Sequence, residues 1–434
     1  MSAAALPLGR IALVSEHASP LAALGGVDSG GQNVYVDQVA RHLGAAGWMA
    51  DVLTRRDDPR LPEIVGLGDG ARVVHIAAGP QETVRKEKLL PHMPAFTRGV
   101  LAFCLREGRP YDLLHANFFM SGLVSAEVKR LLGTPFVVTF HALGRVRRLH
   151  QGAADGFPDE RFEIEERVAA EADRVIAECP QDEDDLTGLY GTDPGKVRVV
   201  PCGFDPAELW PVPRAEARCR LGLPSDERVV LQLGRMVPRK GVEDVVRGFA
   251  RAVHGLGVPA RLLVVGGETS APDPAATPEI GRLMAVADDE GVAERVTFTG
   301  NRGRDALRDY YSAADVFVTC PWYEPFGITP VEAMACGTPV IGSAVGGVKY
   351  SVADGETGFL VPPHDPVALA ERLARLLADE PLRRRLSREC VKRANGLFTW
   401  RRVAAELAAV YAEVLEGRGG ATSERIAAVA GVSG

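Results

Sequence analysis

Several features that mark other protein classes are missing from this chain of 434 residues. Its seven cysteines form no CxxC pair and no Cys/His cluster, which argues against a zinc site or disulfide framework and predicts a reducing, cytoplasmic setting. No apolar run reaches the length of about 18 residues that a membrane span needs, and no signal-peptide pattern opens the chain. The chain has 50 basic and 57 acidic residues, so its net charge is −7. This balance does not indicate the positively charged surface that nucleic-acid binding needs.

The sequence is instead rich in glycine and in short apolar runs. Its 47 glycines follow no G-x-y period, which excludes a collagen-like chain. Alternating strand-like and helix-like segments predict an α/β fold of two Rossmann-like, doubly wound domains with parallel sheets, residues 1–205 and 206–399. A helix at 400–415 and a flexible tail at 416–434 complete the prediction. The expected strands are 10–15, 50–53, 73–75, 111–115, 135–140, 174–177 and 197–200, then, after a proline-rich linker at 201–213, 229–233, 260–266, 296–299, 316–319 and 339–341.

A glycine-rich loop over residues 25–32 follows the first predicted strand. It lacks the GxGxxG spacing of dinucleotide-binding loops, which makes a dehydrogenase a remote alternative. Gly30 and Gly31 at a helix start would let backbone amides approach a phosphate. The alternative is an ordinary capping box of Ser29 and Gln32. The residues alone leave both interpretations open.

Two cations follow the strand at 229–233. Arg235 and Lys240 stand five residues apart in a loop with glycine and proline, at the strand end where this fold binds ligands. Such a pair can clamp a diphosphate. The alternative is two solvated surface cations, the commoner fate of these residue types.

The segment EPFGITPVE, residues 324–332, predicts a helix start with Thr329 as N-cap and Pro330 at the first helical position. The amides of residues 327–329 would then form a seat for an anion. Glu332 either contacts a ligand or merely closes a capping box. Glu324 stands on an irregular loop with no such structural role, and we expect it to contact substrate directly.

His141 follows the predicted strand at 135–140. It is either a satisfied core histidine or a donor to a sugar hydroxyl or to developing charge. Among the acidic residues, Asp28, Asp37 and the run 182–185 are expected to be solvated.

Taken together, these segments resemble the family-4 retaining glycosyltransferases of the GT-B fold. The resemblance spans residues 10 to 415 and is strongest for the branch of sucrose-phosphate synthase, sucrose synthase and the inositol-phosphate glycosyltransferases. It implies two domains facing across a cleft, with the helix at 400–415 packing back on the first. The motifs that carry it are Gly30-Gly31-Gln32-Asn33-Val34-Tyr35, His141, Arg235 with Lys240, and above all the E-x7-E element from Glu324 to Glu332 with Ala333-Met-Ala-Cys-Gly-Thr-Pro-Val340.

The resemblance implies a nucleotide-sugar donor, UDP-glucose in the first place, with no obligatory cofactor and no metal. Arg235 and Lys240 would bind the diphosphate. Glu324 would contact the sugar hydroxyls on the reacting face, His141 the primary hydroxyl and Glu332 the ribose. The base would lie near residues 300–302. The implied catalytic set is His141, Glu324, Arg235 and Lys240, and the implied donor-binding set is Gly30, Gly31, Arg235, Lys240, Asn301, Phe326, Gly327, Ile328, Thr329 and Glu332.

The resemblance also implies a phosphorylated acceptor, a small sugar or cyclitol phosphate. Lys86 and Arg161 match residues that bind the acceptor phosphate, and Asn117 belongs to the same side. Two departures leave the acceptor's identity open. The chain has Asn117-Phe118 where those enzymes commonly have His-Tyr, and Ala142 where the inositol-phosphate branch has threonine.

The implied reaction is hexosyl transfer with retention at the anomeric carbon, in which the leaving diphosphate helps to deprotonate the acceptor hydroxyl. The expected partners are therefore small molecules, with no nucleic acid or integral membrane segment, and a homo-oligomer stays open. Two alternatives keep the fold: a nucleotide-sugar epimerase or hydrolase, which needs no acceptor, and a non-catalytic nucleotide-sugar-binding protein.

Overall fold

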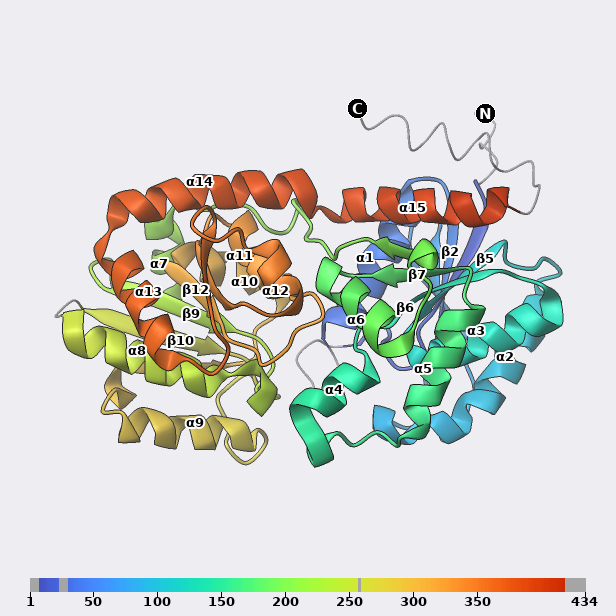
Figure 1. The fold of residues 1–434 in the computed structure, drawn as a ribbon, viewed down its shortest axis with the longest axis horizontal. Helices are drawn as coiled ribbons and strands as arrows, with labels where there is room; N and C mark the ends of the chain where they lie inside the picture. Colours follow the sequence, from blue (N-terminus) through green and yellow to red (C-terminus); the bar gives the residue numbers. More distant parts are fainter. Residues whose placement is uncertain (1–7, 23–29, 257–258, 418–434) are drawn as a thin grey trace. The chain divides into compact units, whose positions relative to one another are not determined.

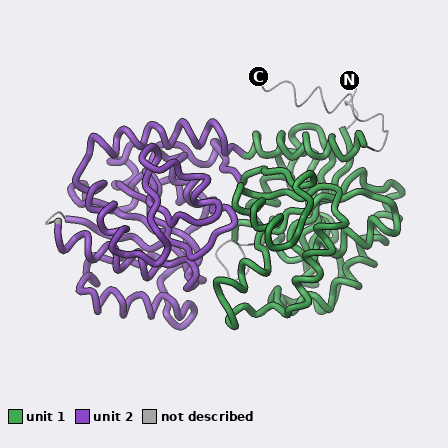
Figure 2. The backbone as a smooth tube through the Cα atoms, viewed as in Figure 1, with its two compact units in different colours: residues 1–22, 28–201, 400–434 green, residues 23–27, 202–399 purple. Residues whose placement is uncertain are grey.

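The computed structural model describes residues 8–22, 30–256 and 259–417. These residues form two compact units (Figure 2). Unit 1 comprises the described residues up to 201 together with 400–417, and unit 2 comprises those from 202 to 399. Gly25, Gly26, Asp28 and Ser29 of the glycine-rich loop, and the predicted tail from 418 onward, lie outside the described residues.

Unit 1 is built on an eight-stranded sheet in the order β3-β4-β2-β1-β5-β6-β7-β8. Helices α2, α3 and α5 cover one face, and α1 and α15 pack together on the other (Figure 1). Its strands are β1 Arg10–Val14, β2 Met49–Arg55, β3 Ile64–Gly68, β4 Ala71–Ile76, β5 Leu113–Asn117, β6 Phe136–Thr139, β7 Arg174–Ala177 and β8 Val197–Val199. Its α-helices are α1 Gly31–Ala45, α2 Met93–Arg106, α3 Phe119–Leu132, α4 Gly144–Gln151, α5 Glu160–Glu171, α6 Pro180–Tyr190 and α15 Trp400–Glu416, and its 3-10 turns are Lys86–Lys88, Leu90–His92, Gly152–Ala154 and Pro194–Lys196.

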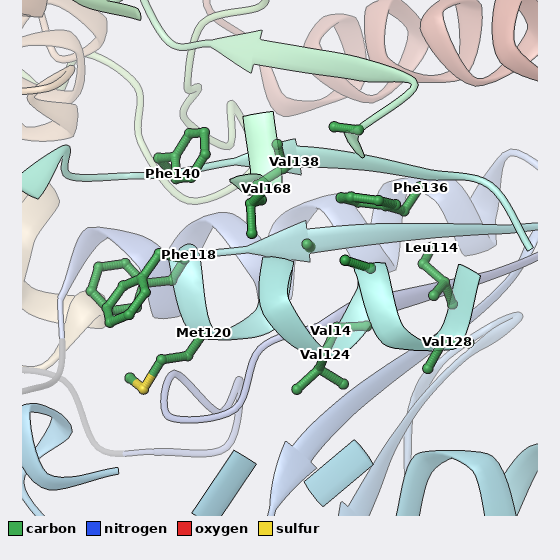
Figure 3. Packing of buried hydrophobic residues seen from close by; sticks show 14 of the residues in the cluster. Val14, Leu114, Phe118, Met120, Val124, Val128, Phe136, Val138, Phe140 and Val168 are labelled. Carbon is green, nitrogen blue, oxygen red and sulfur yellow. The ribbon is translucent and has the colours of Figure 1, made fainter. Parts of the chain in front are cut away.

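The inner strands of unit 1 are apolar because both of their faces are covered. All five residues of β1 are buried, and successive side chains enter opposite layers. On one face Val14 and Leu114 pack with Val124 of α3 and Val168 of α5 (Figure 3). Each fully buried side chain of this kind contributes about 1.5–3 kcal/mol. On the other face Trp400 of α15 is wholly buried, and its ring lies 5.8 Å from that of Tyr35.

Unit 2 contains a six-stranded sheet in the order β11-β10-β9-β12-β13-β14, in which every neighbouring pair is parallel. Its strands are β9 Arg228–Leu233, β10 Ala260–Val265, β11 Val296–Gly300, β12 Val316–Thr319, β13 Val340–Ser343 and β14 Gly358–Val361. Its α-helices are α7 Arg214–Leu221, α8 Val242–Leu256, α9 Pro278–Asp289, α10 Arg304–Ala313, α11 Ile328–Ala335, α12 Gly346–Ser351, α13 Pro366–Ala378 and α14 Glu380–Leu397, with 3-10 turns Pro238–Lys240 and Ala293–Arg295.

The predicted α/β architecture with two parallel-sheet units is confirmed, with two strands missed. β3 is an antiparallel edge strand with two glycines and mostly exposed residues, so it carries no apolar run. β14 is only four residues long and begins with glycine. β3 escapes a search for buried strands because an edge strand needs only one covered face. β14 is mostly buried and escapes the search because its apolar run is only three residues long.

Each sheet has a point where the direction of winding reverses. In unit 1 it lies between β1 and β5, and in unit 2 between β9 and β12. Crevices outside the carboxyl ends of strands at such points are where doubly wound sheets bind ligands.

Within the described residues, no helix has the length and apolar character that crossing a bilayer requires.

Candidate active site

Two loops of unit 2 meet beyond the carboxyl ends of β9 and β12. A Cβ atom on Gly241, whose φ is +63°, would lie 1.8 Å from the carbonyl oxygen of Cys320, so only glycine permits this approach. The Trp322 amide also donates to the Arg239 carbonyl oxygen at 2.9 Å. These contacts hold the loop with Lys240 beside the loop with Glu324.

The Lys240 ammonium donates a short hydrogen bond to the Glu324 carboxylate. Nη1 of Arg239 lies 3.9 Å from the same carboxylate. Arg235 is near enough to act on both charges. The site therefore holds three cations and one anion on largely buried side chains, and this excess of positive charge suits an anionic ligand. The alternative of two solvated cations is wrong for Lys240, whose side chain is 18% exposed and ion-paired.

The protonation of this cluster reflects its burial. Burial lowers the pKa of Lys240 to about 8, with repulsion from Arg239 and Arg235 adding to the effect and attraction to Glu324 opposing it. Burial alone would raise the pKa of Glu324, but Lys240 and the two arginines outweigh it and lower that pKa. Glu324 is thus ionised, and Lys240 is mostly protonated at neutral pH.

The helix that starts in the E-x7-E element differs from the predicted one. α11 begins at Ile328 with Gly327 as N-cap, so the prediction of Thr329 as N-cap is wrong. Glu332 closes no capping box either. It is 3% exposed and accepts hydrogen bonds from the Tyr311 hydroxyl at 2.8 Å and from Arg304 at 3.2 Å. A positive φ of 86° at Gly327 allows the sharp entry that turns the chain into α11.

The segment 300–302 follows β11 on the same sheet. The Asn301 amide donates to the Thr269 carbonyl oxygen at 2.7 Å, and Arg302 donates to the Tyr310 hydroxyl and the Ser270 carbonyl. Phe326 is 2% exposed and packs edge-on against Phe398, so it supports the loop from beneath.

In unit 1, three neighbouring strands place a histidine between two polar side chains. Nε2 of His141, which follows β6, lies 3.0 Å from Oδ1 of Asn117 at the end of β5. Its Nδ1 lies 2.9 Å from the carboxylate of Glu178, which directly follows β7. Because the Asn117 amide nitrogen donates to the carbonyls of Val14 and His115, its oxygen faces the histidine. Both ring nitrogens of His141 therefore face hydrogen-bond acceptors.

His141 is held in a strained backbone conformation, with a φ of 58° that is uncommon for residues other than glycine. Its partner Glu178 was not found from sequence. The available signal was its position, since it directly follows a buried strand as His141 does. Asp182 corrects another expectation: it is buried rather than solvated, and accepts from the Glu178 amide at 3.0 Å. Burial, then repulsion from Glu178, raises the pKa of Asp182 to about 8.

Arg161 is wholly buried in unit 1 and already paired. Its Nε donates to Glu165 at 2.7 Å and its Nη2 donates to the Ala142 carbonyl. Nη1 has no hydrogen-bond partner in the described part of the chain. The guanidinium lies 4.5–4.9 Å from three phenylalanine ring centres. These rings belong to Phe118, Phe119 and Phe157.

Lys86 lies on a 3-10 turn beside this cage. A Cβ atom on Gly156 would lie 3.3 Å from Cγ of Glu87, which brings the turn next to the loop that carries Phe157. The turn that carries Lys86 thus lies next to the loop that leads to Phe157, one of the three rings around Arg161.

Gly30 and Gly31 mark the start of α1, with Gly30 as N-cap. The Gly30 amide donates to Oδ1 of Asn33 at 2.9 Å. Gln32 does not cap the helix, because its side chain donates to the Asn117 carbonyl oxygen at 3.1 Å. The capping residue is therefore Asn33, one position later than predicted.

Two family models match the chain: the glycosyl transferase 4-like domain over residues 30–203, and glycosyl transferases group 1 over residues 213–393. A D-inositol 3-phosphate glycosyltransferase of Acidothermus cellulolyticus is 39% identical over 427 residues, which cover 97% of this chain and 94% of that one. The chain belongs to this glycosyltransferase family. Another D-inositol 3-phosphate glycosyltransferase, from Catenulispora acidiphila, is 40% identical over 94% of this chain and 96% of its own length.

Solved structures are also similar to this chain over most of its length. Sucrose-phosphate synthase from Thermosynechococcus elongatus superposes with a TM-score of 0.87 at 36% identity, covering 94% of this chain and 100% of that one. HepE from Anabaena, solved with UDP and glucose, matches with a TM-score of 0.72 at 19% identity over 93% of this chain and 100% of its own, which shows the fold alone. The glycosyltransferase therefore has the GT-B fold.

Among the described residues of the glycosyltransferase, no group of three His, Cys, Asp or Glu side chains is arranged to hold a metal ion.

Proposed function

We propose that this glycosyltransferase moves a hexosyl group from a nucleotide sugar, UDP-glucose in the first place, to a small phosphorylated sugar or cyclitol, with retention at the anomeric carbon. The observation that carries the proposal is the cluster of Arg235, Arg239 and Lys240 around Glu324 at the switch point of the unit 2 sheet. It supplies both functions that donor activation needs: cations for the diphosphate and a carboxylate for sugar hydroxyls.

The cations would act on the leaving group. As the bond from the anomeric carbon to the diphosphate lengthens, negative charge grows on the diphosphate oxygens. Fixed cations in a largely buried site stabilise this charge more in the transition state than in the ground state, because they need no reorganisation. On binding, the diphosphate would replace Glu324 as the partner of Lys240, which frees the carboxylate to accept from sugar hydroxyls.

Glu332 and His141 would complete the donor site. Glu332 is oriented by Tyr311 and Arg304, so its carboxylate is fixed before a ribose arrives. His141 donates towards Asn117. A sugar hydroxyl entering there would accept from Nε2 and donate to Oδ1 of Asn117. The amides of Gly31, Gly327, Ile328 and Thr329, with Gly30, Asn301 and Phe326, are proposed to complete the donor contacts.

On the acceptor side, Lys86 and Arg161 support a phosphorylated acceptor. Arg161 is wholly buried and ion-paired with Glu165, whereas Lys86 is only partly buried and is therefore more accessible to an incoming phosphate. We therefore assign Lys86 the main phosphate contact, with the unpartnered Nη1 of Arg161 as a second donor once the phenylalanine rings move aside.

The experiment is a screen of nucleotide sugars against acceptors, read by mass spectrometry of product and by UDP release. The acceptors are inositol 3-phosphate, fructose 6-phosphate and their unphosphorylated forms. We expect product with a phosphorylated acceptor, and the preference for it over the plain sugar should fall about tenfold in Lys86→Ala. The matched control is Lys129→Ala, which removes a lysine of α3 that is ion-paired with Asp173.

Two results would contradict the proposal. UDP formation at full rate without any acceptor would favour a hydrolase or epimerase. Binding of UDP-glucose without turnover on any acceptor would favour a non-catalytic binding protein.

A further inference from the structure

Unit 2 carries a second cluster of cations at the amino ends of its strands, opposite the carboxyl ends that lead to the candidate active site. Arg228 begins β9, and Asp315 directly precedes β12. The carboxyl ends of the same two strands lead to Arg235 and Glu324. The Asp315 side chain is wholly buried. Four arginines surround its carboxylate: Arg214 and Arg218 of α7, Arg228, and Arg383 of α14.

The two oxygens of the Asp315 carboxylate have different surroundings. Oδ2 accepts a hydrogen bond from Nη2 of Arg218 at 2.7 Å. Oδ1 accepts from Nη1 of Arg214 at 3.0 Å, and it also lies 3.5 Å from Nε of Arg383 and 3.7 Å from Nη1 of Arg228. Three guanidinium groups therefore converge on one oxygen atom.

Several N–H groups of this cluster lack an acceptor. Nε and Nη2 of Arg383 and Nε of Arg214 are buried and make no hydrogen bond within the described residues. The Arg383 side chain is 1% exposed, and its Nη1 alone is engaged, by the carbonyl oxygens of Leu376 and Leu377. Buried donors without a partner are costly, above all on a charged group, and native proteins normally satisfy them with protein, water or an ion.

The cluster also holds more positive than negative charge. Asp315 supplies one carboxylate to four guanidinium groups. Glu380 also attracts Arg383, but its carboxylate is paired with Arg384 at 2.6 Å. Burial, helped by repulsion from the neighbouring arginines and opposed by attraction to Asp315, lowers the pKa of Arg383. A bound anion would supply both the missing acceptors and the missing negative charge.

Two of the arginines make the cluster accessible from solvent. The side chains of Arg214 and Arg228 are 39% and 31% exposed. They therefore present N–H groups to solvent beside the buried donors of Arg383. Planar guanidinium groups bind phosphate oxygens through paired N–H···O bonds, and a tetrahedral phosphate has enough oxygens to meet several arginines at once.

We propose that Arg214, Arg228 and Arg383 form a second anion site, which binds a phosphate group as inorganic phosphate or as a phosphomonoester. Arg218 takes no part, because its guanidinium is engaged by Asp315 and by two backbone carbonyls. The site goes beyond the proposed function, since it lies at the opposite ends of the strands from the cations assigned to the donor diphosphate.

Protection of arginines from phenylglyoxal, mapped by peptide mass spectrometry, tests the site residue by residue. The reagent modifies accessible guanidinium groups, so the free protein should react at Arg214 and Arg228. Inorganic phosphate at about ten times its Kd should slow both reactions about tenfold. Arg220 is the internal control: it lies on the same helix as Arg214, is 43% exposed and pairs with Glu216 and Asp309. Its rate of modification should not change.

Parallel arms distinguish the source of the phosphate group. Fructose 6-phosphate replaces inorganic phosphate in one arm, and sodium chloride at the same ionic strength measures screening in another. Protection by either phosphate compound supports the proposal and identifies which form the site accepts. Absence of protection by both compounds, equal protection by chloride, or equal protection of Arg220 would overturn it.

Two variants separate this site from the donor site. Arg228→Ala should raise the phosphate concentration that half-protects Arg214 about tenfold, because one charge-assisted contact is lost. Arg218 keeps Asp315 paired in this variant, so unit 2 should still fold. Lys240→Ala should leave the half-protecting concentration unchanged. No effect of Arg228→Ala, or loss of protection in Lys240→Ala, would overturn the inference. Because no transfer is measured, a chain without transferase activity would contradict the proposed function alone.

Discussion

The two units treat charge differently at the carboxyl ends of their sheets. In unit 1 three histidine or arginine side chains each have one carboxylate partner: His17 with Glu16, His141 with Glu178 and Arg161 with Glu165. In unit 2 three cations share Glu324. The first arrangement orients neutral or charge-balanced donors and acceptors, which suits hydroxyl groups. The second leaves positive charge unbalanced, which suits a diphosphate.

The largest effect is expected from breaking a balanced pair in unit 1. Arg161→Ala would leave the Glu165 carboxylate buried without its cation, at a cost of about 3–5 kcal/mol in the free energy of unfolding. Chemical denaturation followed by circular dichroism measures this. Arg167→Ala, on the exposed side of the same helix, should cost less than about 1 kcal/mol. Equal losses in both variants would show that burial of the pair of Arg161 and Glu165 does not increase its contribution to the free energy of unfolding.

In unit 2 the expected loss is in catalysis rather than folding. Lys240→Ala removes a charge-assisted contact to the leaving group and should raise the transfer barrier by about 2.7–4 kcal/mol, that is, lower kcat about 100- to 1000-fold. UDP release under saturating donor and acceptor is the readout. Lys392→Ala, an exposed lysine of α14, should leave kcat unchanged.

Glu324→Gln sharpens the comparison because it increases the imbalance of charge. Without its carboxylate competitor, Lys240 would meet the diphosphate freely, and we expect UDP to bind about tenfold tighter while transfer falls. Calorimetric titration with UDP and an activity assay measure the two effects. Weaker UDP binding would mean that Glu324 positions the cations rather than competing with the ligand.

The smallest expected effect is on the pH profile. Because the pKa of Lys240 lies at about 8, the ammonium loses its proton as the pH rises through this value, and kcat/KM for the donor should fall on the alkaline side. Lys240→Arg should remove this alkaline limb, since a guanidinium stays protonated. A limb that persists in the arginine variant would assign the titration to another group.

The sequence by itself determined the architecture and most of the residue types at the site. Apolar runs of strand length predict parallel strands because such strands are covered on both faces. The rule that ligands bind at strand ends singled out the cations after β9 and the histidine after β6 as candidates. The E-x7-E element located the start of α11 to within two residues.

Only the tertiary structure decided the pairings. Glu178 lies 37 positions from His141 and Ser121 lies 105 from Glu16, and no local pattern links residues that meet through neighbouring strands. The burial of Asp182 and Arg161, and the role of Glu332 with Tyr311 and Arg304, likewise depend on which elements pack together. Hydrogen bonds and ion pairs are short-range, so their partners are set by the packing of the sheets and helices rather than by spacing along the chain.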